Sequence, residues 1–273
     1  MARDHGSYAN PLAKRDLNHC VEALTFMLKS IKNTIQSALR RHGIDVRKVP
    51  ATHEPIPVFN LAVEALMARR GDALRFVQIG ANDGVFGDPL RPYVLTRGWK
   101  GLLVEPQIDV FLKLKKNYVE CGERLVFENL AISFEDKLTL YLPPADMSGR
   151  DQTYAESIVS NNAKVIARQI GTSPANLRRI EVPALTLDAL FEKHGIEELD
   201  LLQIDAEGYD WQVLQTMNLS RFKPHLIQLE SGHLSRDSLT AVARHLNANG
   251  YLIYYGGWQG DLLAMRGEFF GAT

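Results

Sequence analysis

The stretch FVQIGANDGVFGD, residues 76–88, decides how the whole chain folds. An apolar run stops at a small polar loop, which is typical of a buried parallel strand whose end faces a ligand. Gly80 and Gly84 permit backbone conformations that other residues disfavour, and they let a ligand approach closely. The loop is therefore a tight turn, a dinucleotide-binding fingerprint, or the cradle of another adenosine-containing cofactor.

The nicotinamide fingerprint GxGxxG fails in this loop. Counted from Gly80, it needs glycines where the sequence has Asn82 and Val85, and no GK[ST] follows that would make a P-loop. Asp83 argues the same way, because a carboxylate repels a pyrophosphate but attracts an ammonium group such as that of S-adenosylmethionine. A role for Asp83 as a turn former or helix N-cap is the alternative.

An acid at the end of the next apolar run favours an adenosine ligand. Glu105 ends the run GLLVEP, about 20 residues after the loop, where nucleotide-binding sheets carry the acid that binds ribose hydroxyls. The loop thus argues against a dinucleotide, and Glu105 argues for adenosine.

After residue 57, strand patterns alternate with helical patterns. The runs RFVQIG, LLQID and HLIQL are almost continuously apolar, as expected for parallel strands covered on both faces. Helices between them predict an α/β fold with a doubly wound, mostly parallel, Rossmann-like sheet, and the short Gly-rich link before the last strand predicts that this strand is antiparallel. Strands are expected at 75–80, 101–106, 125–133, 137–142, 199–206, 225–230, 251–257 and 261–266, and helices at 60–70, after Pro89, and at 109–120, 187–194, 211–217 and 235–248.

Two parts of the chain do not follow this alternation of strands and helices. Residues 1–56 are expected to form an N-terminal amphipathic helical extension, helical over 17–42, followed by a proline-marked linker. The basic helix is expected to contact the α/β domain or a second subunit, with peripheral contact to anionic lipid as the alternative. The α/β domain is expected over 57–273, with an insertion at about 143–179 that forms a lid, a substrate loop or a variable surface loop.

Composition narrows the class of protein. A formal net charge of −1 gives no reason to expect a nucleic-acid partner. Cys20 and Cys121 lie far apart without a Cys/His cluster, so neither a disulfide framework nor a zinc site is indicated. No run approaches the roughly 20 apolar residues that span a bilayer, and the N-terminus lacks the apolar core of a signal peptide. These features predict a cytoplasmic protein. Peripheral association with the inner membrane surface is compatible with this prediction.

Several motifs, taken together, resemble one family. They are VQIGANDG, LLVEP, ENLAIS, LTLDAL, LLQIDAEGYDWQVL and PHLIQLE, in this order within about residues 75–257. This set resembles the FkbM-type methyltransferases, S-adenosylmethionine-dependent enzymes of the seven-stranded class. The resemblance implies a seven-stranded sheet and methyl transfer to a hydroxyl oxygen of a sugar, glycolipid, polyketide or other glycosylated metabolite. Its partner would then be a small-molecule or glycolipid acceptor.

The same resemblance implies where the cofactor lies. It places the ribose at Glu105 and the methyl-transfer end of the pocket at Asp205. The residues implied around the methionine part are Gly80, Asn82, Asp83 and Gly84, and those implied near the adenine are Asn129, Leu130 and Ala131.

Acidic and histidine side chains follow two late strands. Asp205 and Glu207 come after LLQI, and Glu230 and His233 come after HLIQL. If these strands are neighbours, Asp205 and Glu230 could hold Mg²⁺, which would lower the pKa of an acceptor hydroxyl. The alternative is catalysis without a metal, in which His233 is the general base and Asp205 or Glu230 orients it. Glu207 is also compatible with a simple helix-start role.

Two other functions stay open from the sequence. A similar sheet could serve an oxidoreductase that uses a nicotinamide nucleotide, although the missing GxGxxG weighs against it. The chain could also be a non-catalytic S-adenosylmethionine-binding subunit, although the presence of Asp83, Glu105, Asp205 and Glu230 weighs against loss of function.

Overall fold

The computed structural model describes residues 58–144, 158–256 and 261–270. The expected N-terminal extension and linker, residues 1–56, lie outside the described residues, as do residues 145–157 of the expected insertion. All the described residues belong to the compact unit Ile56–Thr273.

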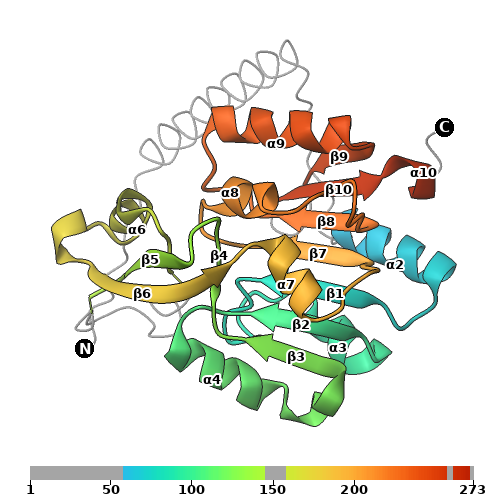
Figure 1. Cartoon of the computed structure of the whole chain (residues 1–273), viewed down its shortest axis with the longest axis horizontal. Coiled ribbons are helices and arrows are strands. Elements are labelled where there is room, and N and C mark those ends of the chain that lie inside the picture. The colour runs from blue at the N-terminus through green and yellow to red at the C-terminus, as the bar shows by residue number, and fades with distance from the viewer. Residues whose placement is uncertain (1–57, 145–157, 257–260, 271–273) are drawn as a thin grey trace, which may run out of the picture. The chain divides into compact units, whose positions relative to one another are not determined.

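A seven-stranded sheet forms the centre of this unit (Figure 1). Its strand order is β3-β2-β1-β7-β8-β10-β9. Neighbours from β3 to β8 pair in parallel, whereas β10 pairs antiparallel with both β8 and β9. The doubly wound, mostly parallel fold with an antiparallel last strand is thereby confirmed. The strands are β1 (Arg75–Ile79), β2 (Lys100–Val104), β3 (Leu125–Glu128), β7 (Leu201–Ile204), β8 (Leu226–Leu229), β9 (Tyr251–Tyr255) and β10 (Leu262–Arg266).

Helices cover both faces of this sheet and explain its apolar strands. Phe76 packs into one core with residues of α2, α3 and α4, whereas Val77 and Ile79 pack into another with residues of α7, α8 and α9. Successive side chains of a strand point to opposite faces, so a strand buried on both needs apolar residues throughout. None of the helices described is long and apolar enough to cross a membrane. The helices are α2 (Val58–Arg70), α3 (Arg91–Arg97), α4 (Ile108–Asn117), α7 (Leu187–Lys193), α8 (Asp210–Gln215), α9 (Arg236–Ala248) and α10 (Gly267–Phe270), with the 3₁₀ turn η1 at Val119–Arg124.

One expected strand is in fact two. The run 125–133 leaves the large sheet after β3, and its continuation β4 (Ala131–Ile132) pairs with β6 (Arg178–Leu185) in a three-stranded sheet of order β4-β6-β5. Between them, the side-chain amide of Asn129 donates hydrogen bonds to the carbonyl oxygens of Glu105 (2.8 Å) and Pro106 (3.0 Å). These bonds anchor the chain where it changes sheets. Because β3 and β4 belong to different sheets, the prediction of a single strand over residues 125–133 was wrong. The remaining strand, β5 (Lys137–Leu142), pairs antiparallel with β6.

The described part of the insertion contacts the loop that follows β7. It contains α6 (Ala163–Ile170) and the 3₁₀ turn η2 (Pro174–Asn176), and it ends where β6 begins. The Ser160 hydroxyl donates to the carbonyl oxygen of Glu207 (2.7 Å), and the Gln169 amide donates to the Glu207 carboxylate (2.9 Å). Side chains of the insertion therefore form hydrogen bonds that hold Glu207 in the loop after β7.

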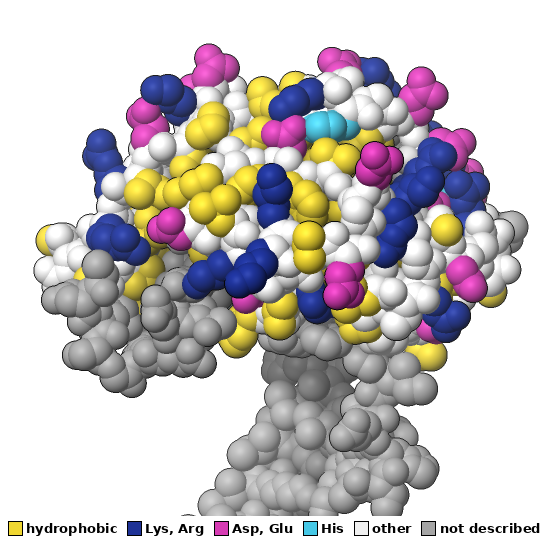
Figure 2. Space-filling model, turned by 90° about the horizontal axis from the view of Figure 1, so that it is seen from below, with side chains coloured by type: hydrophobic (Ala, Val, Ile, Leu, Met, Phe, Trp, Pro, Cys, Tyr) yellow, Lys and Arg dark blue, Asp and Glu magenta, His cyan; other side chains and the backbone are white. Residues whose placement is uncertain are grey.

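The β3 edge of the large sheet carries exposed apolar side chains. Ile108 and Leu112 of α4 are 54% and 58% exposed, and Val126 of β3 is 44% exposed. Figure 2 views the molecule from this side and shows hydrophobic side chains lying among Lys and Arg. This edge lies at the opposite end of the strand order from β9.

Candidate active site

Three neighbouring strands place a row of glutamines near their carboxyl ends. Gln78, Gln203 and Gln228 are register partners on β1, β7 and β8. Because side chains alternate between faces, the residues two positions further on continue the same face beyond the strand ends. Those residues are Gly80, Asp205 and Glu230, and all six line one hollow.

The hollow has two compartments. The apolar compartment is lined by Val104, Pro106, Leu130, Ala131, Leu140 and Tyr209, among others. The polar compartment is lined by the glutamine row and by Asn82, Glu207, Glu230, His233 and Asp261, among others. Gly80, Glu105, Val159 and Asp205 line both. A ligand that spans the two compartments must therefore pass these four residues.

Gly80 follows β1 and lies directly against Asp205, the residue that follows β7. Its φ is 75°, and a Cβ built on it would lie 1.8 Å from the carbonyl oxygen of Asp205. The N–H groups of Gly80 and Ala81 both donate to the carbonyl oxygen of Val104, each at 3.0 Å. No side chain fits at this position, so glycine is required at the border of the compartments.

Glu105 is buried at the same border. Its Oε2 accepts a hydrogen bond from the Asn82 N–H (3.0 Å) and its Oε1 accepts one from the Gln107 N–H (2.8 Å). Burial raises the pKa of Glu105 to about 7, although both N–H donors act in the opposite direction. Each carboxylate oxygen can accept a further hydrogen bond. The residue is thus positioned to receive two hydroxyl groups.

Three residues implied around the cofactor are not among the described residues that line the hollow. Asp83 Oδ1 accepts hydrogen bonds from the N–H groups of Val85 (2.9 Å) and Phe86 (2.8 Å). Gly84 packs so closely on Tyr118 that a Cβ would lie 2.4 Å from its ring. The Asn129 amide binds backbone carbonyls, as described above. The structure therefore places Asp83 as a turn former, the alternative left open by the sequence.

Replacing Asp83 with asparagine is expected to leave the affinity for S-adenosylhomocysteine within about twofold of wild type. Asparagine keeps the Oδ1 acceptor of the turn and removes only the charge. Titration calorimetry of the two proteins checks this. A loss of tenfold or more would show that the Asp83 charge contacts the ligand after all.

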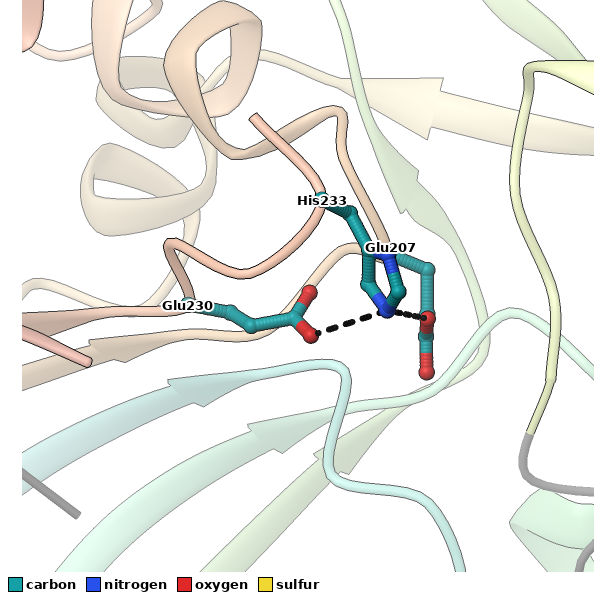
Figure 3. Close-up of side chains that lie close together, drawn as sticks. All are labelled: Glu207, Glu230 and His233. Atoms are coloured by element: carbon teal, nitrogen blue, oxygen red, sulfur yellow. Dashed lines mark ion pairs between the residues drawn. The ribbon is translucent and has the colours of Figure 1, made fainter. Parts of the chain in front are cut away.

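Glu207, Glu230 and His233 converge in the polar compartment (Figure 3). His233 Nε2 lies 3.2 Å from Glu207 Oε2 and 3.4 Å from Glu230 Oε1. Ligand atoms of all three lie within 4.8 Å of one another. Among the described residues, this group joins Glu230 to Glu207 and His233, and Asp205 is not part of it. We call it the Glu207–Glu230–His233 cluster.

Carboxyl groups crowd this compartment. Burial and the Asp205 carboxylate raise the pKa of Glu230 to about 11. The side chain of Asp205 is open to the hollow, yet desolvation by the surrounding protein, together with the Asp210 charge, raises its pKa well above the usual value. No Lys or Arg is found among the described residues that line the compartment. A ligand that brings positive charge or hydrogen-bond donors is therefore favoured over an anion.

Local backbone geometry holds Glu207 in place. Glu207 has a φ of 49°, an uncommon value outside glycine, and Gly208 follows with a φ of 90°. Asp210 is fully buried, and its carboxylate accepts hydrogen bonds from the N–H groups of Ala206 and Gly208, both at 3.1 Å. Asp210 thus holds the turn that carries Glu207. Glu207 therefore does more than start a helix, because its side chain is held in the polar compartment.

The sequence analysis missed several residues of the hollow. The glutamine row and Asp261 were not predicted, and Gln169, from the insertion, contacts both Glu207 and His233 Nε2 (2.8 Å). A signal for the row exists, because each of the runs VQIG, LQID and IQLE carries Gln one residue before the final aliphatic position of its strand.

Comparison with known proteins identifies one family model. The model described as the methyltransferase FkbM domain matches residues 78–253, which is more than half of the chain. The match includes the loop after β1, Glu105 and all three members of the cluster. No curated protein matches the chain in sequence.

Solved structures with similar architecture are distant in sequence. The methyltransferase FkbM from Methylobacillus flagellatus KT shares 14% identity at a TM-score of 0.45, covering 74% of this chain and 47% of its own. This chain thus spans about half the length of that protein. The N-terminal domain of human METTL16 shares 14% identity at a TM-score of 0.40, covering 84% of this chain and 77% of its own. A precorrin-6y C5,15-methyltransferase from Geobacter metallireducens GS-15 shares 12% identity at a TM-score of 0.37, with coverages of 77% and 87%.

Proposed function

The chain belongs to the FkbM methyltransferase family, and from this membership we propose that it transfers the methyl group of S-adenosylmethionine to a hydroxyl oxygen of a sugar, glycolipid or other glycosylated or polyketide metabolite. The observation that carries the proposal is the meeting of an apolar and an acidic compartment at Gly80, Glu105 and Asp205. S-adenosylmethionine has the same division, with an apolar adenine at one end and a cationic methionine part at the other.

The residues of the hollow fit this cofactor. Leu130 and Ala131 would contact the adenine, Glu105 would accept the ribose hydroxyls, and Gly80 would let the methionine part pass over the backbone. Gln78 supports this placement, because its amide donates to Asp88 (3.2 Å) and leaves its buried Oε1 without a described donor. An ammonium group supplies such a donor. When bound, the cofactor supplies an electrophilic methyl group on a sulfonium.

The acid-lined compartment favours a hydroxyl-bearing acceptor. As the oxygen–methyl bond forms, the methyl–sulfur bond breaks, its electron pair stays on sulfur, and the hydroxyl must give up its proton. Because no Lys or Arg is among its described lining residues, the compartment offers no side-chain cation to pair with the phosphate of a phosphorylated acceptor. The Glu207–Glu230–His233 cluster offers two routes for the proton: transfer to His233 Nε2, or a lowered hydroxyl pKa beside a bound cation.

Binding of S-adenosylhomocysteine is expected to tighten as the pH rises from 6 to 8. The ionised form of Glu105 accepts ribose hydroxyls best, and its pKa of about 7 means that this form is lost as the pH falls through 7. Below pH 7 the affinity should fall by up to about tenfold per pH unit. Calorimetric titrations at pH 6, 7 and 8 check this, and Glu105→Gln should flatten the profile.

Transfer of a labelled methyl group tests the proposed activity. Purified protein is incubated with ¹³C-methyl-labelled S-adenosylmethionine and glycosylated metabolite extracts, and the products are examined by NMR. Label at an O-methyl position is the expected result. Label only at nitrogen or carbon would contradict O-methyl transfer. Binding of NAD in preference to S-adenosylhomocysteine would instead support the oxidoreductase alternative, and binding of S-adenosylhomocysteine without transfer would support the non-catalytic one.

A further inference from the structure

We propose that the Glu207–Glu230–His233 cluster binds one divalent transition-metal cation. Two carboxylates and one imidazole reach this position from the loops that follow β7 and β8, and Figure 3 shows His233 between the two acids. Its Nε2 lies 3.2 Å from Glu207 and 3.4 Å from Glu230. A three-residue set of this kind leaves further coordination positions for water or substrate.

The chemistry of the three ligands selects the class of cation. Magnesium prefers an all-oxygen shell, whereas imidazole suits ions such as zinc and iron, and manganese accepts carboxylate shells. One nitrogen and two carboxylates therefore favour Mn²⁺ or Zn²⁺ over Mg²⁺. Both the ion and the ligand pair differ from the sequence-based expectation of Mg²⁺ at Asp205 and Glu230.

A second observation in the same compartment points to an unseen donor. Gln203 and Gln228 are 5% and 2% exposed, both line the compartment, and the Oε1 of each has no described hydrogen-bond partner. The Oε2 of Glu230 is likewise buried without one. Buried acceptors without donors are rare in native proteins. Water molecules held by a cation at the cluster would donate hydrogen bonds to these oxygens.

A similar His–Glu pair elsewhere lacks these features. Glu128 Oε1 lies 2.7 Å from His194 Nε2, but Lys193 Nζ lies 2.6 Å from the same oxygen. The Lys193 ammonium supplies the positive charge that a metal ion would bring. The Glu207–Glu230–His233 cluster has no Lys or Arg among its described neighbours in the compartment. The Glu128–His194 pair therefore provides a matched control.

The cation would act on the methyl acceptor. Placed at the cluster, it lies in the compartment proposed for the acceptor and would lower the pKa of a coordinated hydroxyl. The proton would then leave to water, and His233 would serve as a ligand and not as the base. This role rests on the proposed function, whereas cation binding itself does not.

The test uses the full chain after treatment with a chelator. Mn²⁺ is titrated into the protein and followed by calorimetry and electron paramagnetic resonance, and Mg²⁺ is titrated in parallel. We expect one Mn²⁺ per chain, bound more tightly than Mg²⁺. Glu207→Gln, Glu230→Gln and His233→Gln should each weaken Mn²⁺ binding by about tenfold or more. Glu128→Gln and His194→Gln should bind Mn²⁺ as the wild type does.

Two results would overturn the proposal: no stoichiometric Mn²⁺ binding by the wild type, or unchanged affinity in all three cluster variants. Thermal unfolding of each variant establishes that it is folded, and the three independent positions keep the test valid if one variant fails. S-adenosylhomocysteine is titrated into the same samples. A protein that binds S-adenosylhomocysteine but no Mn²⁺ would overturn only the cation site. A protein that binds Mn²⁺ but no S-adenosylhomocysteine would overturn only the proposed function.

Discussion

Replacing Glu105 with alanine is expected to weaken binding of S-adenosylhomocysteine by about 100-fold. Hydrogen bonds to a charged group contribute about 1.5–3 kcal/mol each, and loss of two to the ribose removes about 3 kcal/mol. The substitution also frees the N–H groups of Asn82 and Gln107, which the carboxylate holds at 3.0 and 2.8 Å. Both effects lower affinity, and calorimetric titration measures their sum.

Glu128 provides the control for this substitution. It ends β3 at the register position next to Val104 of β2, so it is a carboxylate at the same sheet edge as Glu105. Its partners are Lys193 and His194, and it does not line either compartment. Glu128→Ala should therefore bind S-adenosylhomocysteine with wild-type affinity. Equal losses in the two variants would mean that Glu105 does not contact the ligand directly.

Replacing Gly80 with alanine is expected to destabilise the folded protein severely. The new Cβ would lie 1.8 Å from the Asp205 carbonyl oxygen. The alanine would also have to adopt a backbone φ of 75°, in the left-handed region. Left-handed backbone costs about 1–2 kcal/mol for alanine, and forcing β1 and β7 apart adds about 1–3 kcal/mol. Against a typical total stability of about 5–15 kcal/mol, this loss is large. Chemical denaturation monitored by circular dichroism measures it.

Gly71 separates the two causes of this loss. It follows α2 with a φ of 90°, but a Cβ there would have no neighbour within 4 Å. Gly71→Ala should therefore lose only about 1–2 kcal/mol, the cost of the backbone conformation. If Gly80→Ala lost no more than Gly71→Ala, the close approach of β1 and β7 at Gly80 would be contradicted.

The central sheet follows from the sequence because its signals are local. Strands buried on both faces must be apolar throughout, and RFVQIG, LLQID and HLIQL show this in the sequence alone. The split at Asn129 is different. LVFENLAIS has strand character along its length, and only the hydrogen bonds from Asn129 to the β2 loop show where the chain changes sheets. Contacts between residues far apart in the sequence leave no such local pattern.

The candidate site was predictable where a single position decides the chemistry. Glu105 and Gly80 stand at strand ends, and the structure places both in the hollow. The role of Asp83 could not be decided from the sequence, because an aspartate suits a turn and a cationic ligand equally. The choice of Glu207 over Asp205 as the neighbour of His233 depends on the turn held by Asp210, which is a three-dimensional property.

The acidity of the hollow is also hidden in the composition. The whole chain has a formal net charge of −1, so its average charge indicates no preference for any partner. The fold nevertheless gathers Glu105, Asp205, Glu207, Glu230 and Asp261 around one compartment. Local charge of this kind, and not net charge, determines which ligands the site accepts.

A structure of the full chain with bound S-adenosylhomocysteine tests the central claim most directly. We expect the ribose hydroxyls on Glu105, the adenine against Leu130 and Ala131, and the methionine part over Gly80. The sulfur should face the Glu207–Glu230–His233 cluster, because the methyl group must reach an acceptor held there. Adenosine bound outside the two compartments, or a sulfur directed away from the cluster, would contradict the proposed site.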